Sequence, residues 1–330
     1  MGKLNLSVAI GDYDRNRPLF DGQVQIDGVS SVFMALEPEE IFFRAFRHEE
    51  FDICELSLSS YTVKVSRGNA PYVAIPAFLS RAFRHTSIYI RKDRGIREPK
   101  DLIGKKIGLP EYQLTACVWA RALLEEDYSV RPSDVTWVRG GLEQPGRPEK
   151  IALDLPGDIR LESAPEGKSL NQMLIEGTLD AYLGPRAPSA FDQGHPEITR
   201  LFADPTAAAQ DYYRRTGIFP IMHVLGIRRS IVEANPWLPA ACLKAFQRSK
   251  TVALDKLTDT SATKVTLPFV EEQLAAARAL MGPDFWPYGI GPNRVTLERF
   301  VEYHHRQGLS TRKVAVDELF HPSTLEAHSI

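Results

Sequence analysis

Cysteine is scarce in this chain of 330 residues, which has only Cys54, Cys117 and Cys242, far apart from one another. The sequence contains no Cys-x-x-Cys pair and no spacing typical of zinc ligands, so a disulfide framework and a structural metal are both disfavoured. Small buried thiols in a reducing compartment are the expected alternative.

Long apolar runs are also missing. No window approaches the roughly 18 uninterrupted apolar residues of a membrane span. Near the N-terminus apolar residues alternate with polar ones and charges follow by Asp12, unlike the apolar core of a secretory signal. The sequence therefore predicts a cytoplasmic protein that does not engage a membrane.

An excess of charge of one sign is absent as well, since 40 Lys and Arg against 42 Asp and Glu leave a formal net charge of -2. Such a chain has no basic field for nucleic acid, which is not an expected partner. No repeat or low-complexity tract occurs, and the length suggests two domains of roughly 150 residues each. Self-association into a homo-oligomer stays open.

What the chain does contain is an alternation of strand and helix patterns. Strand patterns cover residues 3–11, 24–36, 51–57, 72–78 and 86–92, and helix patterns cover 37–51 and 58–68. In the first helix, Pro38 lies near the start and Ile41, Phe42, Ala45 and Phe46 recur at helical spacing. Alternating strands and helices predict sheets with both faces covered.

A second such unit follows the first. It has strand patterns at 105–109, 134–141, 159–165 and 179–188, helix patterns at 114–126 and 168–177, and a Pro/Gly-rich stretch at 142–158 that predicts a surface loop. After a strand at 216–229 that contains Pro220 and His223, three helix patterns complete the chain at 235–257, 267–282 and 293–309. Two crossings therefore predict one lobe from 1–86 and 222–330 and another from 87–221.

In open α/β sheets, ligands bind at the carboxyl ends of strands. This rule selects polar residues at four strand ends and at the two crossings between lobes. They are Asp12, Tyr13, Glu55, Ser57, Glu111, Tyr112, Gln113, Arg186, Arg84, His85 and His223.

Several of these residues lie in strings that resemble a known family. The string "DLIGKKIGLPEYQLTACVWARALLEED" is similar to the opening of the second lobe in type II periplasmic-binding-protein folds. More narrowly, "RAFRHTSIYI", "GLPEYQLTA", "GIFPIMHVLGIRR" and "DFWPYGIGPNRVTLERFVEYHHRQGLSTRKVAVDELFHP" resemble the 4,5-dihydroxyphthalate decarboxylase family, and the likeness covers nearly the whole chain. It implies an α/β fold of two lobes, each a mixed sheet flanked by helices, with a ligand cleft between them.

The resemblance implies non-oxidative decarboxylation of a hydroxylated aromatic dicarboxylate. No cofactor is expected and no spacing of metal ligands occurs, while assistance by a divalent metal stays open. Such a site needs a general acid near the carbon that loses CO2, an acceptor for a phenolic proton, and cations for the carboxylates. His223 is the leading acid and His85 the second, because histidine titrates near neutral pH. Either could instead bind a carboxylate, and His85 could cap a strand.

Arginines are the expected carboxylate ligands. Arg186, on a turn after a strand, leads, with Arg81 and Arg84 as alternatives. Asp12 and Glu55 could accept phenolic protons or cap the helices that follow them.

Three residues precede or begin a predicted helix, where its N-terminus favours anions. They are Tyr112, Gln113 and Thr115, and capping is the alternative for Thr115. His304, His305 and Glu302 are interpreted as a solvated helical face rather than as metal ligands.

Two other functions remain open. A solute-binding protein or sensor for an organic anion uses the same fold, although delivery to a transporter requires export. Another lyase on this scaffold, such as a thiamin-precursor synthase, needs a cysteine-rich motif that three scattered cysteines do not supply.

Overall fold

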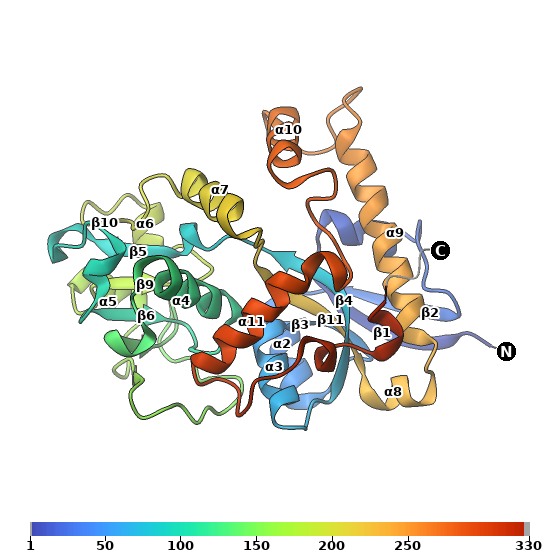
Figure 1. Cartoon of the computed structure of the whole chain (residues 1–330), viewed down its shortest axis with the longest axis horizontal. Helices are drawn as coiled ribbons and strands as arrows, with labels where there is room; N and C mark the ends of the chain where they lie inside the picture. The colour runs from blue at the N-terminus through green and yellow to red at the C-terminus, as the bar shows by residue number, and fades with distance from the viewer. Residues whose placement is uncertain (1, 327–330) are drawn as a thin grey trace. The chain divides into compact units, whose positions relative to one another are not determined.

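Two compact units, each built around one sheet, make up the part of the chain that the computed structural model describes, residues 2–326 (Figure 1). The first unit combines the described residues up to Ser80 with His223–Glu298 and those from Val314 onward. The second combines Arg81–Met222 with Arg299–Lys313. One limit between the units falls at the end of strand β4 (Tyr72–Arg81), and another falls inside strand β11 (Ile221–Arg228).

The first sheet has the strand order β2-β1-β3-β11-β4. Its strands are β1 (Leu4–Ile10), β2 (Val29–Ala35), β3 (Ile53–Ser57), β4 (Tyr72–Arg81) and β11 (Ile221–Arg228). The strands β2, β1 and β3 are mutually parallel, whereas β11 runs antiparallel to β3. Because all five residues of β3 are buried, this strand is covered on both faces.

The helices of the first unit include those predicted from the patterns at 37–51, 58–68, 235–257, 267–282 and 293–309. They are α1 (Arg17–Phe20), α2 (Pro38–His48), α3 (Leu58–Ser66), α8 (Arg229–Ala234), α9 (Leu238–Thr258), α10 (Val270–Met281) and the start of α11 (Arg294–Arg306). In α2, Pro38 lies in the first turn and the four predicted apolar residues are buried, so this prediction is confirmed.

The second sheet has the order β10-β5-β9-β6-β7-β8. Its strands are β5 (Ile88–Arg91), β6 (Lys106–Leu109), β7 (Thr136–Arg139), β8 (Arg160–Ser163), β9 (Ala181–Leu183) and β10 (Ile198–Arg200). Here β9, β6, β7 and β8 are parallel, and β5 is antiparallel to both β9 and β10. Its helices are α4 (Thr115–Tyr128), α5 (Leu170–Glu176), α6 (Ser189–Asp192) and α7 (Pro205–Thr216).

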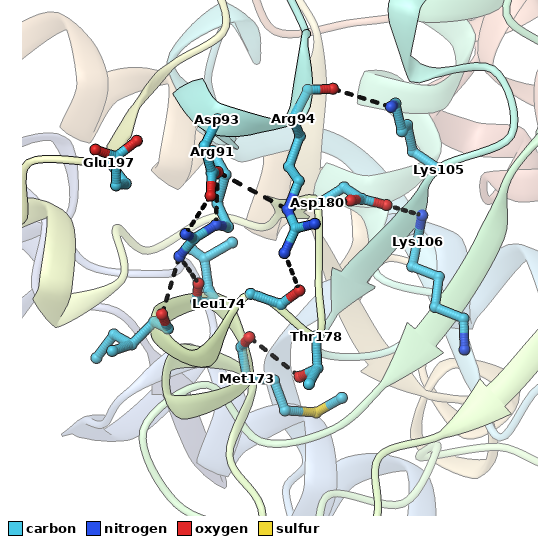
Figure 2. A network of polar contacts seen from close by, with 12 residues as sticks. Arg91, Asp93, Arg94, Lys105, Lys106, Met173, Leu174, Thr178, Asp180 and Glu197 are labelled. Atoms are coloured by element: carbon cyan, nitrogen blue, oxygen red, sulfur yellow. Dashed lines mark hydrogen bonds and ion pairs between the residues drawn. The ribbon is translucent and has the colours of Figure 1, made fainter.

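Two arginines satisfy the carbonyls at the C-terminal end of α5 (Figure 2). Arg91 Nη1 donates to the carbonyls of Leu174 and Ile175 at 2.8 and 2.9 Å, and Arg94 donates to the carbonyl of Gly177. Cations at this end of a helix satisfy unpaired carbonyls and complement the helix dipole. The network therefore connects the C-terminal end of α5 to the end of β5. The charged groups of Arg91 and Arg94 thus have a structural role.

The segment Arg299–Lys313 belongs to the second unit, whereas the sequence put all of 222–330 in the first lobe. Gln307 explains the difference. Its side chain accepts from Arg121 Nε at 2.9 Å and donates to the carbonyl of Val118 at 3.0 Å, both on α4. Such side-chain contacts between distant segments leave no periodic trace in a sequence.

The predicted fold class is confirmed: each unit is a mixed sheet flanked by helices. The sequence analysis left β10, α1, α6, α7 and α8 undescribed. For α7 a signal was available, because Asp204 caps the helix by accepting from Ala207 N, Pro205 follows in the first turn, and Gly217 ends it.

Two further expectations concern burial. All three cysteines are buried and reduced, as predicted. The prediction that His304 lies on a solvated helical face is wrong. His304 is fully buried, and its ring centroid lies 5.6 Å from that of Phe300. The two residues are four apart on α11, so they share the face that packs inward. Among the described residues, no helix is long and apolar enough to cross a membrane.

Candidate functional site

A carboxylate, Glu55, lies in the fully buried strand β3 of the first unit, and three donors surround it. Its Oε2 accepts from the backbone N–H of Gly11 at 2.9 Å. Its Oε1 accepts from the hydroxyl of Tyr13 at 2.9 Å and lies 2.6 Å from Nδ1 of His223. Buried charges in proteins are paired and hydrogen-bonded in this way because isolated ones are costly.

The strand register brings Glu55 and His223 together. In the antiparallel pair β3–β11, His223 is opposite Ser57 and Leu225 is opposite Glu55. Side chains directly opposite share a face, as do those two apart on one strand, so Glu55 and His223 are diagonal neighbours on the same face. On the other side, parallel pairing of Ala9 with Cys54 places the end of β1 beside Glu55.

Gly11 and its neighbours hold Tyr13 in place. A Cβ atom at Gly11 would lie 2.4 Å from the Tyr13 ring, so the ring occupies space that only glycine leaves open. The guanidinium of Arg15 lies 4.3 Å from the ring centroids of both Tyr13 and Trp286. The Tyr13 hydroxyl is thereby directed at the carboxylate.

Opposing effects set the protonation of this cluster. Burial alone would raise the pKa of Glu55, but the hydrogen bond and charge of His223, with the Gly11 and Tyr13 donors, outweigh it and lower the pKa. Burial and the adjacent Glu55 charge raise the pKa of Tyr13 well above its usual value. At neutral pH Glu55 is therefore an anion and Tyr13 a protonated donor.

His223 is the exposed end of the pair. Its side chain is 18% exposed, whereas that of Glu55 is fully buried. The ring of Phe42 packs edge-on against the imidazole at 4.7 Å. With Nδ1 bonded to an ionised carboxylate, Nδ1 carries a proton and Nε2 is the nitrogen at which protons can be exchanged.

Two other predicted residues of the first unit have structural partners. Asp12 is exposed and forms an ion pair with Arg17. Ser57 caps α3, where its hydroxyl accepts from Ser60 N at 3.5 Å. The helix that follows β3 is therefore capped by Ser57, and the alternative that Glu55 is the cap is wrong.

In the second unit, Glu111 is the centre of a buried ion cluster. Only 1% of its side chain is exposed, and it receives Arg147 Nη2 at 2.8 Å and Lys150 Nζ at 2.5 Å. Lys150 N also donates to Glu111 Oε2 at 3.1 Å. Glu111 thus fastens the Pro/Gly-rich stretch to the end of β6.

Glu149 also connects the Pro/Gly-rich stretch to the segment after β6, where it contacts Tyr112 and Gln113. It accepts from Tyr112 N at 2.6 Å and from Gln113 Nε2 at 2.9 Å, and Gln113 also donates to the carbonyl of Ile151 at 2.8 Å. Burial raises the pKa of Glu149. Tyr112 and Gln113 are fully buried here.

Thr115 and Arg186 complete the predicted residues on the second sheet. Thr115 is the first residue of α4 and is buried, while the helix cap is Leu114, so the alternative that Thr115 is the cap is wrong. Arg186 lies exposed on the turn after β9.

His85 is a core histidine of the second unit. It is 3% exposed, and its ring packs edge-on against Phe202 and Tyr212 at 5.2 and 5.5 Å. Burial lowers its pKa to about 4. The ring is therefore neutral at pH 7 and holds no acidic proton of the imidazolium type.

The two remaining arginines differ in how they are satisfied. Arg81 is buried, donates to the carbonyl of Phe219 at 3.1 Å and stacks over that ring. Arg84 donates through Nε to the thioether sulfur of Met222 at 3.3 Å. Burial lowers the pKa of Arg84 to about 10. A sulfur is a weak acceptor for a guanidinium.

A curated relative decides the family. The 4,5-dihydroxyphthalate decarboxylase of Comamonas testosteroni is 58% identical over 330 residues, covering 100% of both chains.

The chain belongs to the 4,5-dihydroxyphthalate decarboxylase family.

A second curated member, from Pseudomonas putida, is 64% identical over 214 residues, which are 65% of this chain and 83% of that protein. The family model described as NMT1/THI5 like matches residues 19–145. The resemblance stated from the sequence is thus confirmed.

Solved structures show where this decarboxylase family stands among folds. The periplasmic aliphatic sulphonate binding protein SsuA from Escherichia coli aligns with a TM-score of 0.53 at 12% identity, covering 99% of this chain and 95% of that one. Protein AF1704 from Archaeoglobus fulgidus gives 0.53 at 15% identity over 92% and 98%. At such identities the likeness shows the fold alone, which is that of periplasmic binding proteins.

Some polar partners in this family member escaped the sequence analysis. Arg147, Glu149 and Lys150 fall in the stretch predicted as a surface loop, and their partners are more than 35 residues away in sequence. No local pattern signals such pairs. Across residues 2–326, no group of three or more His, Cys, Asp or Glu side chains could hold a metal ion.

Proposed function

We propose that the chain is a carboxy-lyase that converts 4,5-dihydroxyphthalate to protocatechuate and CO2. The full-length likeness to a decarboxylase supports the substrate class. One observation carries the mechanism: the 2.6 Å contact between buried Glu55 and partly exposed His223. A histidine oriented by an ionised carboxylate is suited to general acid catalysis.

The reaction must avoid a ring carbanion whose electron pair lies in the ring plane. Electron density from the hydroxyl para to a carboxylate flows to the carbon that bears it, and that carbon takes a proton. The C–C bond then breaks, its electrons restore aromaticity, and CO2 leaves. Since the substrate is symmetric, either carboxylate is equivalent until it is bound.

His223 supplies that proton from Nε2, while its Nδ1–H continues to donate to Oε1 of Glu55. Each turnover replaces one carboxylate by one hydrogen, so His223 recovers a proton from water afterwards. The Glu55 carboxylate orients the imidazole through the contact with Nδ1. Glu55 already accepts from three donors, so it acts as a positioning residue and not as the acceptor of a phenolic proton.

Arg84 is the arginine we assign to a substrate carboxylate. Its hydrogen-bonding partner is a thioether, and its burial disfavours the unpaired cation. A carboxylate ligand would offset this cost through charge-assisted hydrogen bonds. Arg81, in contrast, is engaged with Phe219. The cytoplasmic location and the roles of Asp12, Tyr112, Gln113 and Arg186 stay predictions.

The test is to incubate the purified full chain with 4,5-dihydroxyphthalate in D2O. We expect CO2 release and protocatechuate that carries a single deuterium at the carbon that lost the carboxylate. Tight binding of the compound without CO2 release would instead support the solute-binding alternative. Product without deuterium would contradict protonation from an exchangeable group.

A further inference from the structure

Tyr182, in strand β9 of the second unit, buries its hydroxyl without a hydrogen-bonding partner. The residue is 1% exposed, and its oxygen has no donor or acceptor in the described part of the chain. The ring packs among apolar side chains that include Leu170 and Leu179. Buried polar atoms are nearly always hydrogen-bonded, because an unpaired one has lost its bonds to water. Packing of the ring therefore does not explain the hydroxyl.

Gly184, two residues further along the chain, leaves the space that this hydroxyl occupies. A Cβ atom at Gly184 would overlap the Tyr182 oxygen. Gly184 has no positive φ, so the close approach of the hydroxyl, and not the backbone conformation, is what requires glycine there. The Tyr182 oxygen thus lies over the backbone at the C-terminal end of β9.

The turn that carries Arg84 lies at the same edge of the sheet. Strand β5 is antiparallel to β9 in the second sheet, with Ile88 opposite Leu183 (Figure 1), so the start of β5 lies beside the end of β9. Gly184 N donates to the carbonyl of Ser87 at 3.0 Å, and Ser87 N donates to the carbonyl of Arg84 at 3.0 Å. Two backbone hydrogen bonds therefore connect Gly184 to Arg84.

The N-terminus of α4 reaches the end of β9 from the other side. Gly108 of β6 pairs in parallel with Tyr182, so the segment that leads from β6 into α4 starts at this edge. Cys117, in the first turn of α4, contacts the carbonyl of Leu183 through its sulfur at 3.8 Å. The N-cap residue, Leu114, has no side-chain oxygen with which to cap the helix. The first backbone N–H groups of a helix favour an anion.

The groups at this edge are donors and a cation. Burial raises the pKa of Tyr182 well above its usual value and that of Cys117 to about 12, so both are protonated at neutral pH. After burial, the Cys117 thiol is the next influence on the pKa of Tyr182 and on that of Arg84. Arg84 donates to the thioether of Met222, which leaves its charge uncompensated by that contact.

Carboxylates of the neighbouring segments have donors of their own. Glu111 lies 2.5 Å from Nζ of Lys150, and Glu149 accepts from a backbone N–H at 2.6 Å. Glu143 accepts from the hydroxyl of Ser189 at 2.7 Å. The buried hydroxyl is thus left for an anion that enters from solution.

We propose that Tyr182 is a substrate-binding residue whose hydroxyl donates to an oxygen of the carboxylate that Arg84 holds. The assignment rests on the proposed function, which supplies that carboxylate. A carboxylate has two oxygens and can accept from a guanidinium and a phenol together. Donors that stabilise a negative charge oppose its loss as neutral CO2, so this carboxylate is the one that the product keeps.

Calorimetric titration of the full chain with protocatechuate, the product of the proposed reaction, tests the contact without turnover. Tyr182→Phe removes one oxygen and should raise the Kd by about 10–100-fold, the usual effect of losing a hydrogen bond to a charged group. The KM for 4,5-dihydroxyphthalate should rise in the same proportion. The midpoint of urea unfolding should not fall, because the free protein loses no hydrogen bond.

Tyr61→Phe is the matched control, at a buried tyrosine of the first unit whose hydroxyl is satisfied. That hydroxyl donates to the carbonyl of Leu319 at 2.8 Å and accepts from Ala74 N at 3.1 Å. Its removal should lower the urea midpoint and leave the Kd unchanged. If Tyr182→Phe behaves like Tyr61→Phe, the hydroxyl is structural and the proposal is overturned.

A double-mutant cycle shows whether Tyr182 and Arg84 hold one carboxylate. Arg84→Lys and Tyr182→Phe should not act independently, so the double variant should lose less binding free energy than the two single losses added together. Strictly additive losses would overturn the shared carboxylate. A wild-type chain that binds 4,5-dihydroxyphthalate but not protocatechuate would do the same.

Failure of the proposed function has a different outcome. A wild-type chain that binds protocatechuate through Tyr182 but releases no CO2 from 4,5-dihydroxyphthalate overturns the proposed reaction and supports the contact. CO2 release by the wild type, with the same Kd for Tyr182→Phe, overturns the contact and leaves the reaction in place.

Discussion

Nδ1 of His223 lies 2.6 Å from Oε1 of Glu55, across two antiparallel strands and 168 residues of sequence. The carboxylate is fully buried and the imidazole is not. The pair therefore combines a fixed negative charge with a ring that can reach a ligand or water. The predictions below start from this division of roles and extend to the second unit.

Replacing His223 by Asn should lower kcat for 4,5-dihydroxyphthalate by about 10²–10⁴-fold, the usual contribution of a general acid. The fold should persist, because Asn can still donate to Glu55. CO2 release under saturating substrate is the measurement. His48→Asn, at an exposed histidine of the same unit, is the control. Activity of His223→Asn within a few-fold of wild type would remove His223 from this role.

Glu55→Gln keeps the size of the side chain but removes its charge. The group that accepts from Nδ1–H and orients the imidazole of His223 is then a neutral amide, so kcat should fall while KM changes little. Steady-state kinetics of both proteins are the measurement. An unchanged kcat would mean that the charge of Glu55 does not contribute.

Arg84→Gln should raise KM strongly, and Arg84→Lys should restore only part of the loss, since lysine cannot bind a carboxylate bidentately. Arg186→Gln is the comparison, because Arg186 is exposed on a turn. Steady-state kinetics of the three variants decide between the two arginines. If KM rises for Arg186→Gln and not for Arg84→Gln, the assignment passes to Arg186.

His85 should make the protein less stable in mild acid. Its folded pKa is lowered to about 4 from 6.5, so between these values the unfolded chain takes up a proton that the folded chain does not. Stability is full above about pH 6.5 and falls toward pH 4, by on the order of 3 kcal/mol from this group. His85→Phe, which suits the aromatic surroundings, should flatten this slope in urea unfolding. An unchanged slope would contradict the assignment.

Glu111→Gln should lower the free energy of unfolding by about 3–5 kcal/mol, because the buried Lys150 loses the carboxylate charge that lies 2.5 Å from its Nζ. Limited proteolysis should then cut within residues 144–157 faster than in wild type. Glu162→Gln provides the control, since its ion pair with Lys106 is more than half exposed and should change stability by about 1 kcal/mol at most. Equal effects of both variants would argue against the buried cluster.

Much of the fold could be read from periodicity. The helix at α2 and the strand at β3 were predicted because apolar spacing and a first-turn proline are local signals. The ends of strands also drew attention to Glu55 and Tyr13, and the crossing between the predicted lobes drew attention to His223. Their mutual contacts could not be predicted, because the register between β3 and β11 depends on packing across the whole sheet.

His85 and His223 illustrate the limit. Both lie at crossings between the predicted lobes, His85 just before one strand pattern and His223 inside another, and by sequence they differ little. The structure buries one among aromatic rings, which keeps it neutral, and sets the other against an anion. Burial and partner charge, which decide protonation, are properties of three-dimensional neighbours.

The sequence by itself determined the family, the α/β class and the residue types available for acid catalysis, because motifs and apolar periods are written along the chain. Only the tertiary structure decided which histidine meets a carboxylate, that Tyr13 serves Glu55, and that Glu111 is held by Arg147 and Lys150. Those pairs join residues from 36 to 168 positions apart. Their energies arise from desolvation and distance, which exist only once the strands have paired and the loops have closed over them.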